Sequence, residues 1–169
     1  MIFDLRKERP TRGCEKMART NFENLRIYRL SELLADEIWK IASAWKPFAK
    51  DTLGKQMVRA ADSIGANIAE GSGRGSSQDN RRFIRMARGS LCETQHWLRR
   101  AFNRKLLTSR QVEKLKPLID ELSPKVNSYL HAVSNTVESE RERLFRRTKD
   151  QRPKTKDQKP RARLNAATS

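Results

Sequence analysis

The sequence is poor in the residues that build disulfide frameworks, turn-rich repeats and membrane spans. Its 169 residues include only two cysteines, seven glycines and six prolines, which excludes a disulfide-stapled or collagen-like fold. Cys92 lies within an apolar helical pattern and is expected to behave as a small hydrophobic residue. No apolar run has the length of a membrane helix or of a signal-peptide core. Runs of β-branched residues are scarce as well. We therefore expect an all-helical cytoplasmic protein with no membrane contact.

Charge, in contrast, is abundant and unbalanced, with a formal net charge of +17 at pH 7. Residues 141–169 carry eleven basic and three acidic side chains and too few large apolar groups to offset the entropy of ordering them. Residues 1–21 carry six basic and three acidic side chains. We expect a disordered basic extension over residues 1–21, a folded domain over 22–140, and a mostly disordered basic tail over 141–169.

Four stripes of apolar residues at helical spacing fill the predicted domain. Pro47 is expected to end the first helix, because proline disfavours helical geometry in the residue before it. Gly71 is expected to end the second in a left-handed conformation. Pro117 and Pro124 lie off the fourth stripe and predict a kinked or locally interrupted helix rather than two helices. The stripes are Ile27, Leu30, Leu34, Ile38, Ile41 and Trp45; Leu53, Met57, Ala60, Ile64 and Ile68; Phe83, Ala87, Leu91, Leu98 and Phe102; and Val112, Leu115, Ile119, Leu122, Val126, Tyr129, Val133 and Val137.

The breaks between the stripes carry signals for the start of a helix. Ser76 precedes Asp79, and Thr108 precedes Gln111, each with the three-residue spacing of a helix cap. The linking segments are short, which favours antiparallel neighbours. The predicted fold is therefore an antiparallel up-down-up-down four-helix bundle.

Residues 22–137 resemble the bacterial four-helix-bundle family that includes proteins encoded within intervening sequences of 23S ribosomal RNA genes. The resemblance implies a ring-forming homo-oligomer, with five chains as the expected number. A more distant similarity is to the accessory protein of diversity-generating retroelements, which pairs with a reverse transcriptase and binds nucleic acid. The matching residues are Phe22-Glu23-Asn24-Leu25, Gln56, Arg59-Ala60-Ala61, Ser63-Ile64, Asn67-Ile68-Ala69-Glu70-Gly71, Gly73-Arg74, Phe83, and Ala87-Arg88-Gly89-Ser90-Leu91-Cys92-Glu93.

A set of polar residues lies among the apolar ones of the second and third predicted helices. If buried, these residues need partners, because an unsatisfied buried polar group costs about 1–3 kcal/mol. One interpretation is a ligand or catalytic pocket. The favoured one is a hydrogen-bonded network that fixes helix register or a contact between subunits, since no nucleophile and base are paired and the chain is not expected to be an enzyme. The predicted network consists of Arg59, Ser63, Asn67, Glu70, Ser90 and Glu93.

Two motifs that suggest a metal or a nucleotide are incomplete. Glu93 and His96 form one Glu-x-x-His step, but a di-iron bundle needs two, and His131 follows Ser128 at the corresponding spacing. The glycine-rich turn at residues 71–75 follows a helix rather than a strand and lacks the lysine of a nucleotide-binding loop. We expect no metal and no cofactor.

Arginines recur on one side of the third predicted helix, where Arg81, Arg85 and Arg88 are spaced by four and three residues. Such a stripe can be a plain solvated face. Together with the net charge and the basic tail, it favours nucleic-acid binding through phosphates. The aromatic residues look like core residues, which gives base stacking little support. The predicted nucleic-acid-binding residues are Arg74, Arg81, Arg82, Arg85, Arg88, Arg99 and Arg100.

Two functions from different classes remain open. The first is a non-enzymatic scaffold that binds nucleic acid, and RNA in particular. The second is an oligomeric protein-interaction scaffold, for example an accessory subunit of a nucleic-acid-processing enzyme such as a reverse transcriptase. Self-association is favoured in either case by Leu33, Trp39 and Trp97, which lie beside rather than on the apolar stripes.

Overall fold

The computed structural model describes residues 21–150, and every regular element in that range is helical. The all-helical prediction is confirmed for this part of the chain. The predicted extension, residues 1–21, and the predicted tail, residues 141–169, lie largely outside the described residues. The elements are η1 (Asn21–Asn24), α1 (Arg26–Ser43), α2 (Pro47–Ala49), the π-helical turn η2 (Lys50–Gly54), α3 (Lys55–Gly73), α4 (Ser77–Asn103) and α5 (Ser109–Asp150).

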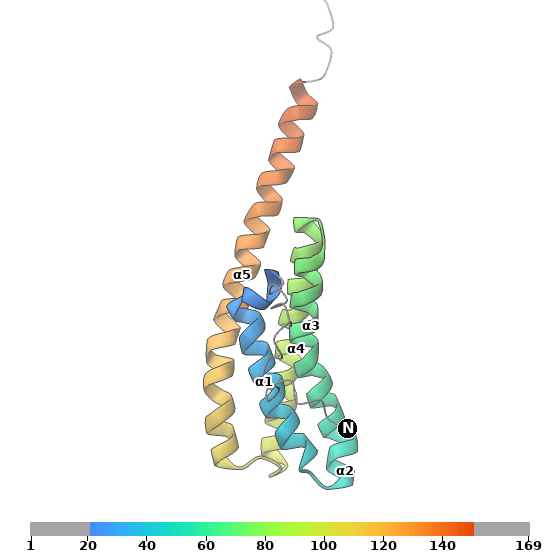
Figure 1. Cartoon of the computed structure of the whole chain (residues 1–169), viewed down its shortest axis with the longest axis vertical. Helices are drawn as coiled ribbons and strands as arrows, with labels where there is room; N and C mark the ends of the chain where they lie inside the picture. The colour runs from blue at the N-terminus through green and yellow to red at the C-terminus, as the bar shows by residue number, and fades with distance from the viewer. Residues whose placement is uncertain (1–20, 151–169) are drawn as a thin grey trace, which may run out of the picture. The chain divides into compact units, whose positions relative to one another are not determined.

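Backbone contacts divide the chain between Val137 and Glu138. The part before this boundary is a bundle of α1, α3, α4 and the preceding length of α5 (Figure 1). The part after it is described as helical over residues 138–150. Its side chains are exposed over residues 138–149, where Leu144 and Phe145 are 62% and 70% exposed. Among the described residues, no helix combines the length and apolar character needed to cross a membrane.

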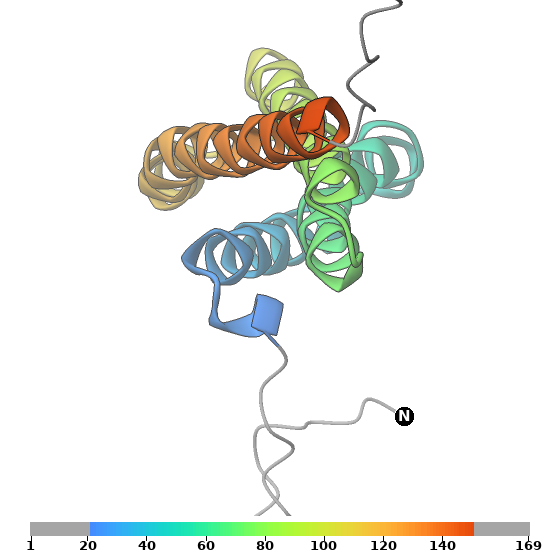
Figure 2. The same ribbon diagram turned by 90° about the horizontal axis from the view of Figure 1, so that it is seen from above.

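Helix α3 is closely packed on two sides. Its Cα atoms lie within 8 Å of those of both α1 and α4, and α3 lies beside both helices in the view from above (Figure 2). Two glycines permit this approach. At Gly65 a Cβ atom would lie 3.1 Å from Ser31 Oγ, and at Gly71 it would lie 2.9 Å from both Asn80 Oδ1 and Phe83 Cβ. A side chain at Gly71 would therefore push α3 and α4 apart.

The buried core follows most of the predicted stripes, although Trp45, Val112, Ile119 and Tyr129 are only half-buried. Phe102, placed on the third stripe, is 55% exposed. Cys92, expected to behave as a small buried hydrophobic residue, is exposed too. Both predictions are wrong because the neighbouring helices do not cover those sides of α4. The largest fully buried side chains are Leu30, Ser31, Leu34, Ile38, Met57, Ile64, Ile68, Ile84, Thr94, Leu122 and Val126.

Helix α5 completes the bundle through large apolar side chains and through a few hydrogen bonds to the side chains of other helices. Its buried residues, among them Leu115, Leu122 and Val126, join the common core. Glu121 accepts two hydrogen bonds from Arg26 of α1, at 2.9 and 3.0 Å. Gln95 Nε2 of α4 donates to Ser123 Oγ at 3.2 Å. Side-chain hydrogen bonds therefore connect α5 to α1 and α4.

The predicted end of the second helix at Gly71 is wrong. Helix α3 continues to Gly73, and the next residue, Arg74, is extended. Gly71 instead serves the close approach of α4. Lys105, just after α4, is the non-glycine residue with a positive φ in the described part of the chain, and its φ is 58°. The left-handed cap was therefore predicted at the wrong helix end.

Both predicted helix starts are confirmed. Ser76 Oγ accepts a hydrogen bond from the Asp79 backbone N–H at 3.1 Å. Thr108 and Gln111 form a reciprocal capping box, in which Gln111 Oε1 accepts from the Thr108 N–H at 2.8 Å and Thr108 Oγ1 from the Gln111 N–H at 3.3 Å. Each cap satisfies donors that the first helical turn leaves without a backbone partner.

The two internal prolines do not interrupt the last helix. Helix α5 runs continuously past Pro117 and Pro124, which confirms one helix rather than two. Both prolines are exposed, so a carbonyl that loses its amide partner can turn toward water. The predicted local interruption is therefore not formed.

Candidate nucleic-acid interface

The outer side of α4 is strongly basic. The helix contains six arginines and only two acidic residues, Asp79 and Glu93. At about 100° per residue, Arg81, Arg85, Arg88 and Arg99 fall within roughly 60° of one another around the helix axis. The rise of 1.5 Å per residue places the first and last of these four about 27 Å apart. An extended anionic polymer could contact them together.

The remaining arginines of α4 widen this basic side, which we call the α4 basic face (Arg81, Arg82, Arg85, Arg88, Arg99 and Arg100). Arg81 is half-buried and the other five are exposed. Arg82 and Arg100 lie on a flank, about 100° around the helix from Arg81. The face thus brings together six of the seven predicted nucleic-acid-binding residues on one element.

Arg74, the seventh predicted residue, lies in the turn between α3 and α4. Its guanidinium pairs with the Glu70 carboxylate and lies over the Phe83 ring, 5.2 Å from the centroid. Arg82 approaches the same ring at 5.9 Å. Cation–π contacts of this kind hold the side chains near the turn. Because its guanidinium is paired with Glu70, Arg74 is a weaker candidate than Arg85 and Arg88 of the α4 basic face.

The predicted polar network does not link α3 to α4 within one chain. Ser63 Oγ donates to the Arg59 carbonyl, and Asn67 Nδ2 to the Ser63 carbonyl, each at 2.7 Å. Ser90 Oγ donates to a carbonyl of its own helix at 3.2 Å. Such bonds satisfy each polar group along one helix and fix no register between helices.

Glu70 and Glu93 complete the predicted set, and both are exposed. Glu70 holds Arg74, while Glu93 accepts a hydrogen bond from Trp97 Nε1 at 3.2 Å. Neither carboxylate is buried with a partner on the other helix. A role for this set in a contact between subunits stays a prediction.

The histidine that follows Glu93 packs against an aromatic ring. His96 is exposed and meets the Trp97 ring edge-on, with 4.9 Å between ring centroids. Within the described residues, no group of three histidine, cysteine, aspartate or glutamate side chains is arranged to hold a metal ion.

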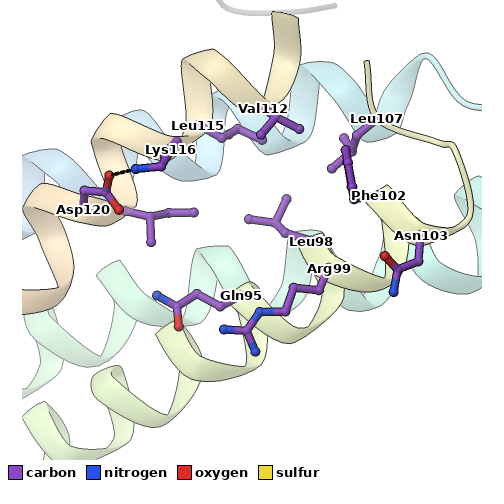
Figure 3. A pocket seen from close by; sticks show the side chains of 11 residues that line it. Gln95, Leu98, Arg99, Phe102, Asn103, Leu107, Val112, Leu115, Lys116 and Asp120 are labelled. Atoms are coloured by element: carbon purple, nitrogen blue, oxygen red, sulfur yellow. Dashed lines mark hydrogen bonds and ion pairs between the residues drawn. The ribbon is translucent and has the colours of Figure 1, made fainter. Parts of the chain in front are cut away.

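A cavity of about 480 Å³ opens between α4 and α5. Figure 3 shows Leu98 and Leu115 directed into the gap, with Gln95, Arg99 and Asn103 along the α4 side. Phe102, Leu107, Val112 and Ile119 line it as well, and Lys116 lies beside Asp120 at the α5 rim. The cavity therefore has an apolar interior, a polar rim and one arginine of the α4 basic face.

Sequence reasoning missed this cavity because it assigned Phe102 to the core. The one available signal was position: Phe102 is the last stripe residue before α4 ends at Asn103. Near a helix end, fewer neighbouring side chains remain to cover an apolar residue. The sequence did not indicate that Gln95 and Asn103 line a cavity, because this depends on where α5 lies.

A second surface, between α1 and α3, has a different character. Two adjoining grooves of about 650 and 550 Å³ share Asp62 and Ala66. Leu33 lines one and Trp39 the other, and these side chains are 50% and 61% exposed. Burial, and then the nearby negative charge of Asp36, raise the pKa of the Asp62 carboxyl. This surface combines exposed apolar side chains with residues of both charges, in contrast to the one-sided charge of the α4 basic face.

Comparison with known proteins agrees with the helical architecture. Residues 23–128 match the family model of the 23S rRNA-intervening sequence protein. A crystal structure of a protein of unknown function from the S23 ribosomal protein family of Bacteroides thetaiotaomicron is similar at a TM-score of 0.55 and 24% sequence identity. The similarity covers 62% of this chain and 97% of that one, and it supports the fold alone. No curated protein matches the sequence.

Proposed function

Because the chain belongs to the 23S rRNA-intervening sequence protein family, we propose that it is a non-enzymatic scaffold that binds nucleic acid, RNA in particular, through the phosphate backbone. The observation that carries the proposal is the α4 basic face, where six arginines lie on one helix with two acidic residues. Phosphates of an extended strand offer the matching partner.

The strength of such binding depends on how many phosphates are neutralised together. Each neutralised phosphate contributes about 0.7 units to the logarithmic salt dependence for a single strand and about 0.9 for a B-form duplex. A face of several arginines over about 27 Å of helix is long enough for several phosphates. Binding should therefore weaken steeply as salt rises.

The proposal also includes assembly into a homo-oligomer of antiparallel up-down-up-down bundles. The exposed Leu33 and Trp39 side chains in the grooves between α1 and α3 support a contact between chains. The number of five chains depends on the family resemblance. In such a ring, the α4 basic face would be repeated in each copy and the field that attracts an anionic polymer would be multiplied.

Salt titration of RNA binding tests the proposed function. In the full chain, Arg85, Arg88 and Arg100 are replaced by Gln, and a single-stranded RNA oligonucleotide is titrated at several salt concentrations. If each arginine meets one phosphate, the slope should fall by roughly two units. A matched control replaces Arg110, Lys114 and Lys125 of α5 by Gln, which removes the same net charge elsewhere. Equal losses in both variants would contradict a local binding face.

Light scattering tests assembly separately. Replacing Leu33 and Trp39 by Ser should lower the molar mass toward that of one chain, because exposed apolar groups no longer drive association. A monomeric mass for the unaltered chain at micromolar concentration would contradict the oligomer. If the oligomer forms but RNA binding is absent, the protein-interaction scaffold becomes the better description.

A further inference from the structure

The cavity between α4 and α5 joins three chemical features that seldom meet by chance. Its interior is apolar, with Leu98 and Leu115 only 8% and 3% exposed. The Phe102 side chain, 55% exposed, borders it and offers an accessible aromatic ring. The same lining includes Arg99, which belongs to the α4 basic face. An aromatic surface beside an arginine suits a flat ring that is attached to a phosphate.

The rim supplies hydrogen-bonding groups of both kinds. Gln95 Nε2 donates to Ser123 Oγ at 3.2 Å, which orients the amide and leaves its carbonyl oxygen and its second N–H to offer a ligand. Asn103 is exposed and offers one acceptor and two donors. Asp120 is the acidic group of the lining, and its carboxylate is paired with Lys116. Lys116 therefore balances the negative charge of Asp120, and the repulsion of an anionic ligand by this carboxylate is reduced.

From these features we propose that the cavity binds an unpaired base of single-stranded nucleic acid, stacked on Phe102, with the adjoining phosphate on Arg99. The inference rests on the proposed function and adds a base-binding site to a surface otherwise suited to phosphates. A cavity of about 480 Å³ lies within the range of small-ligand sites, roughly 300–1,000 Å³, so a base can enter. Bases within a duplex cannot, because they are stacked and paired.

An unpaired base fits the lining better than an aliphatic chain does. An aliphatic ligand would use the leucines but would leave the amides of Gln95 and Asn103 and the Arg99 guanidinium without a role. A base uses its face on the aromatic ring and its polar edge on the amides. Recognition of RNA bases commonly combines these two contacts.

The test uses the full chain and a single-stranded oligouridine, an oligomer of equal length with abasic sites, and an RNA duplex. Phe102→Ala should weaken oligouridine binding roughly 5- to 150-fold, the range expected for loss of one base stacked on an aromatic residue. Binding of the abasic oligomer and the duplex should not change. Phe102→Trp should retain oligouridine binding. Phe48→Ala is the matched control, because Phe48 is 83% exposed in α2, away from the cavity lining.

A second measurement detects base stacking directly in the unaltered chain. An oligonucleotide with one 2-aminopurine should lose fluorescence on binding the unaltered chain, because the fluorescent base stacks on Phe102, and Phe102→Ala should abolish that change. The inference would be overturned if Phe102→Ala weakened binding of the abasic oligomer as much as binding of oligouridine. It would also be overturned if Phe102→Ala had no more effect on oligouridine binding than Phe48→Ala. A free mononucleotide that binds as tightly as the oligonucleotide would overturn it as well, since the ligand would then be the nucleotide itself.

The outcomes also separate this inference from the proposed function. Salt-dependent RNA binding without any dependence on bases would overturn the base site alone. Absence of RNA binding by the unaltered chain would overturn both. A change of molar mass in Phe102→Ala would assign the cavity to a contact between copies of the chain and would overturn the base site.

Discussion

Helices α3 and α5 bury their apolar sides in different ways. Helix α3 alternates large residues with Ala60, Ala61, Gly65 and Gly71, and its backbone lies close to both α1 and α4. Helix α5 presents leucines and valines to the common core and borders the cavity that opens between it and α4. The distance between helix axes depends on the side chains at the contact. Small residues therefore allow a close helix contact that tolerates no added atoms, whereas the larger residues of α5 border a cavity.

This difference bears on the proposed function. A closely packed α3 fixes the orientation of α4, so the arginines of the α4 basic face are presented from a rigid support. The space beside α5 is where a ligand can enter. Three predictions test whether the contrast between the two helices is real, and a fourth concerns the carboxylates between α1 and α3.

The largest effects are expected from truncating one buried residue in each helix. Ile64 of α3 is fully buried, and Leu115 of α5 is buried but already borders the cavity. Large-to-small changes in cores cost about 2–5 kcal/mol, depending on how well the surrounding side chains can close the space. We expect Ile64→Ala near the upper end and Leu115→Ala near the lower end, measured as the free energy of unfolding in urea. Equal losses of stability would indicate that α5 is as densely packed as α3.

Adding one methyl group tests the closest approach in the bundle. Gly71→Ala places a Cβ atom 2.9 Å from Phe83 Cβ. Overpacking costs about 1–3 kcal/mol, and the better helix propensity of alanine returns about 1 kcal/mol. A net loss of up to about 2 kcal/mol is expected from these two values.

Gly89→Ala is the control for that substitution, because nothing lies within 4 Å of the Cβ that alanine would add there. It should stabilise the protein by up to about 1 kcal/mol through helix propensity. Thermal or urea unfolding of both variants gives the comparison. If Gly71→Ala were as stabilising as Gly89→Ala, close packing of α3 on α4 would be disproved.

Enlarging a side chain of α5 that lines the cavity should raise the stability rather than lower it. Val112 is half-buried and lines the cavity, so Val112→Leu can extend into open space. Burial of one additional methylene group is worth about 0.8 kcal/mol. We expect a small gain in stability by urea unfolding, together with weaker oligouridine binding as the cavity fills. A loss of stability would show that this side of α5 has no spare room.

The smallest effect concerns the carboxylates between α1 and α3. Burial and the charge of Asp36 raise the pKa of Asp62, so the folded state binds the Asp62 proton more tightly than the unfolded state does. The ionised form therefore costs stability once the pH exceeds the raised pKa, and this cost disappears below the ordinary carboxyl pKa of about 4. Asp62→Asn should melt slightly above the unaltered chain at pH 7, and the difference should vanish near pH 3.

Glu37 provides the control of opposite sign. A hydrogen bond from Lys40 lowers the pKa of the Glu37 carboxyl, so its ionised form stabilises the folded state above the ordinary pKa. Glu37→Gln should melt slightly below the unaltered chain at pH 7, and this difference should fade as the pH drops through the lowered pKa. Melting curves between pH 3 and 7 that move both variants in the same direction would refute these assignments.

Helix identity and most of the core could be predicted because they depend on local spacing. Ile27 through Ile41 and Leu53 through Ile68 recur every three or four residues, and that period alone decides which side of a helix is buried. The Ser76 and Thr108 caps were equally predictable, since each cap and its partner lie within one turn. The arginines of α4 share one side for the same reason.

The tertiary structure alone decided which exposed and buried positions fall near one another. Gly71 looked like a helix end, and only the approach of Phe83 on α4 shows that it is a packing position. Phe102 looked like core, and only the spacing of α5 from α4 leaves it accessible beside Arg99. Helical periodicity is a property of a few consecutive residues. The distance between two helices depends on side chains far apart in the sequence, and that distance creates both the tight contact of α3 and the cavity beside α5.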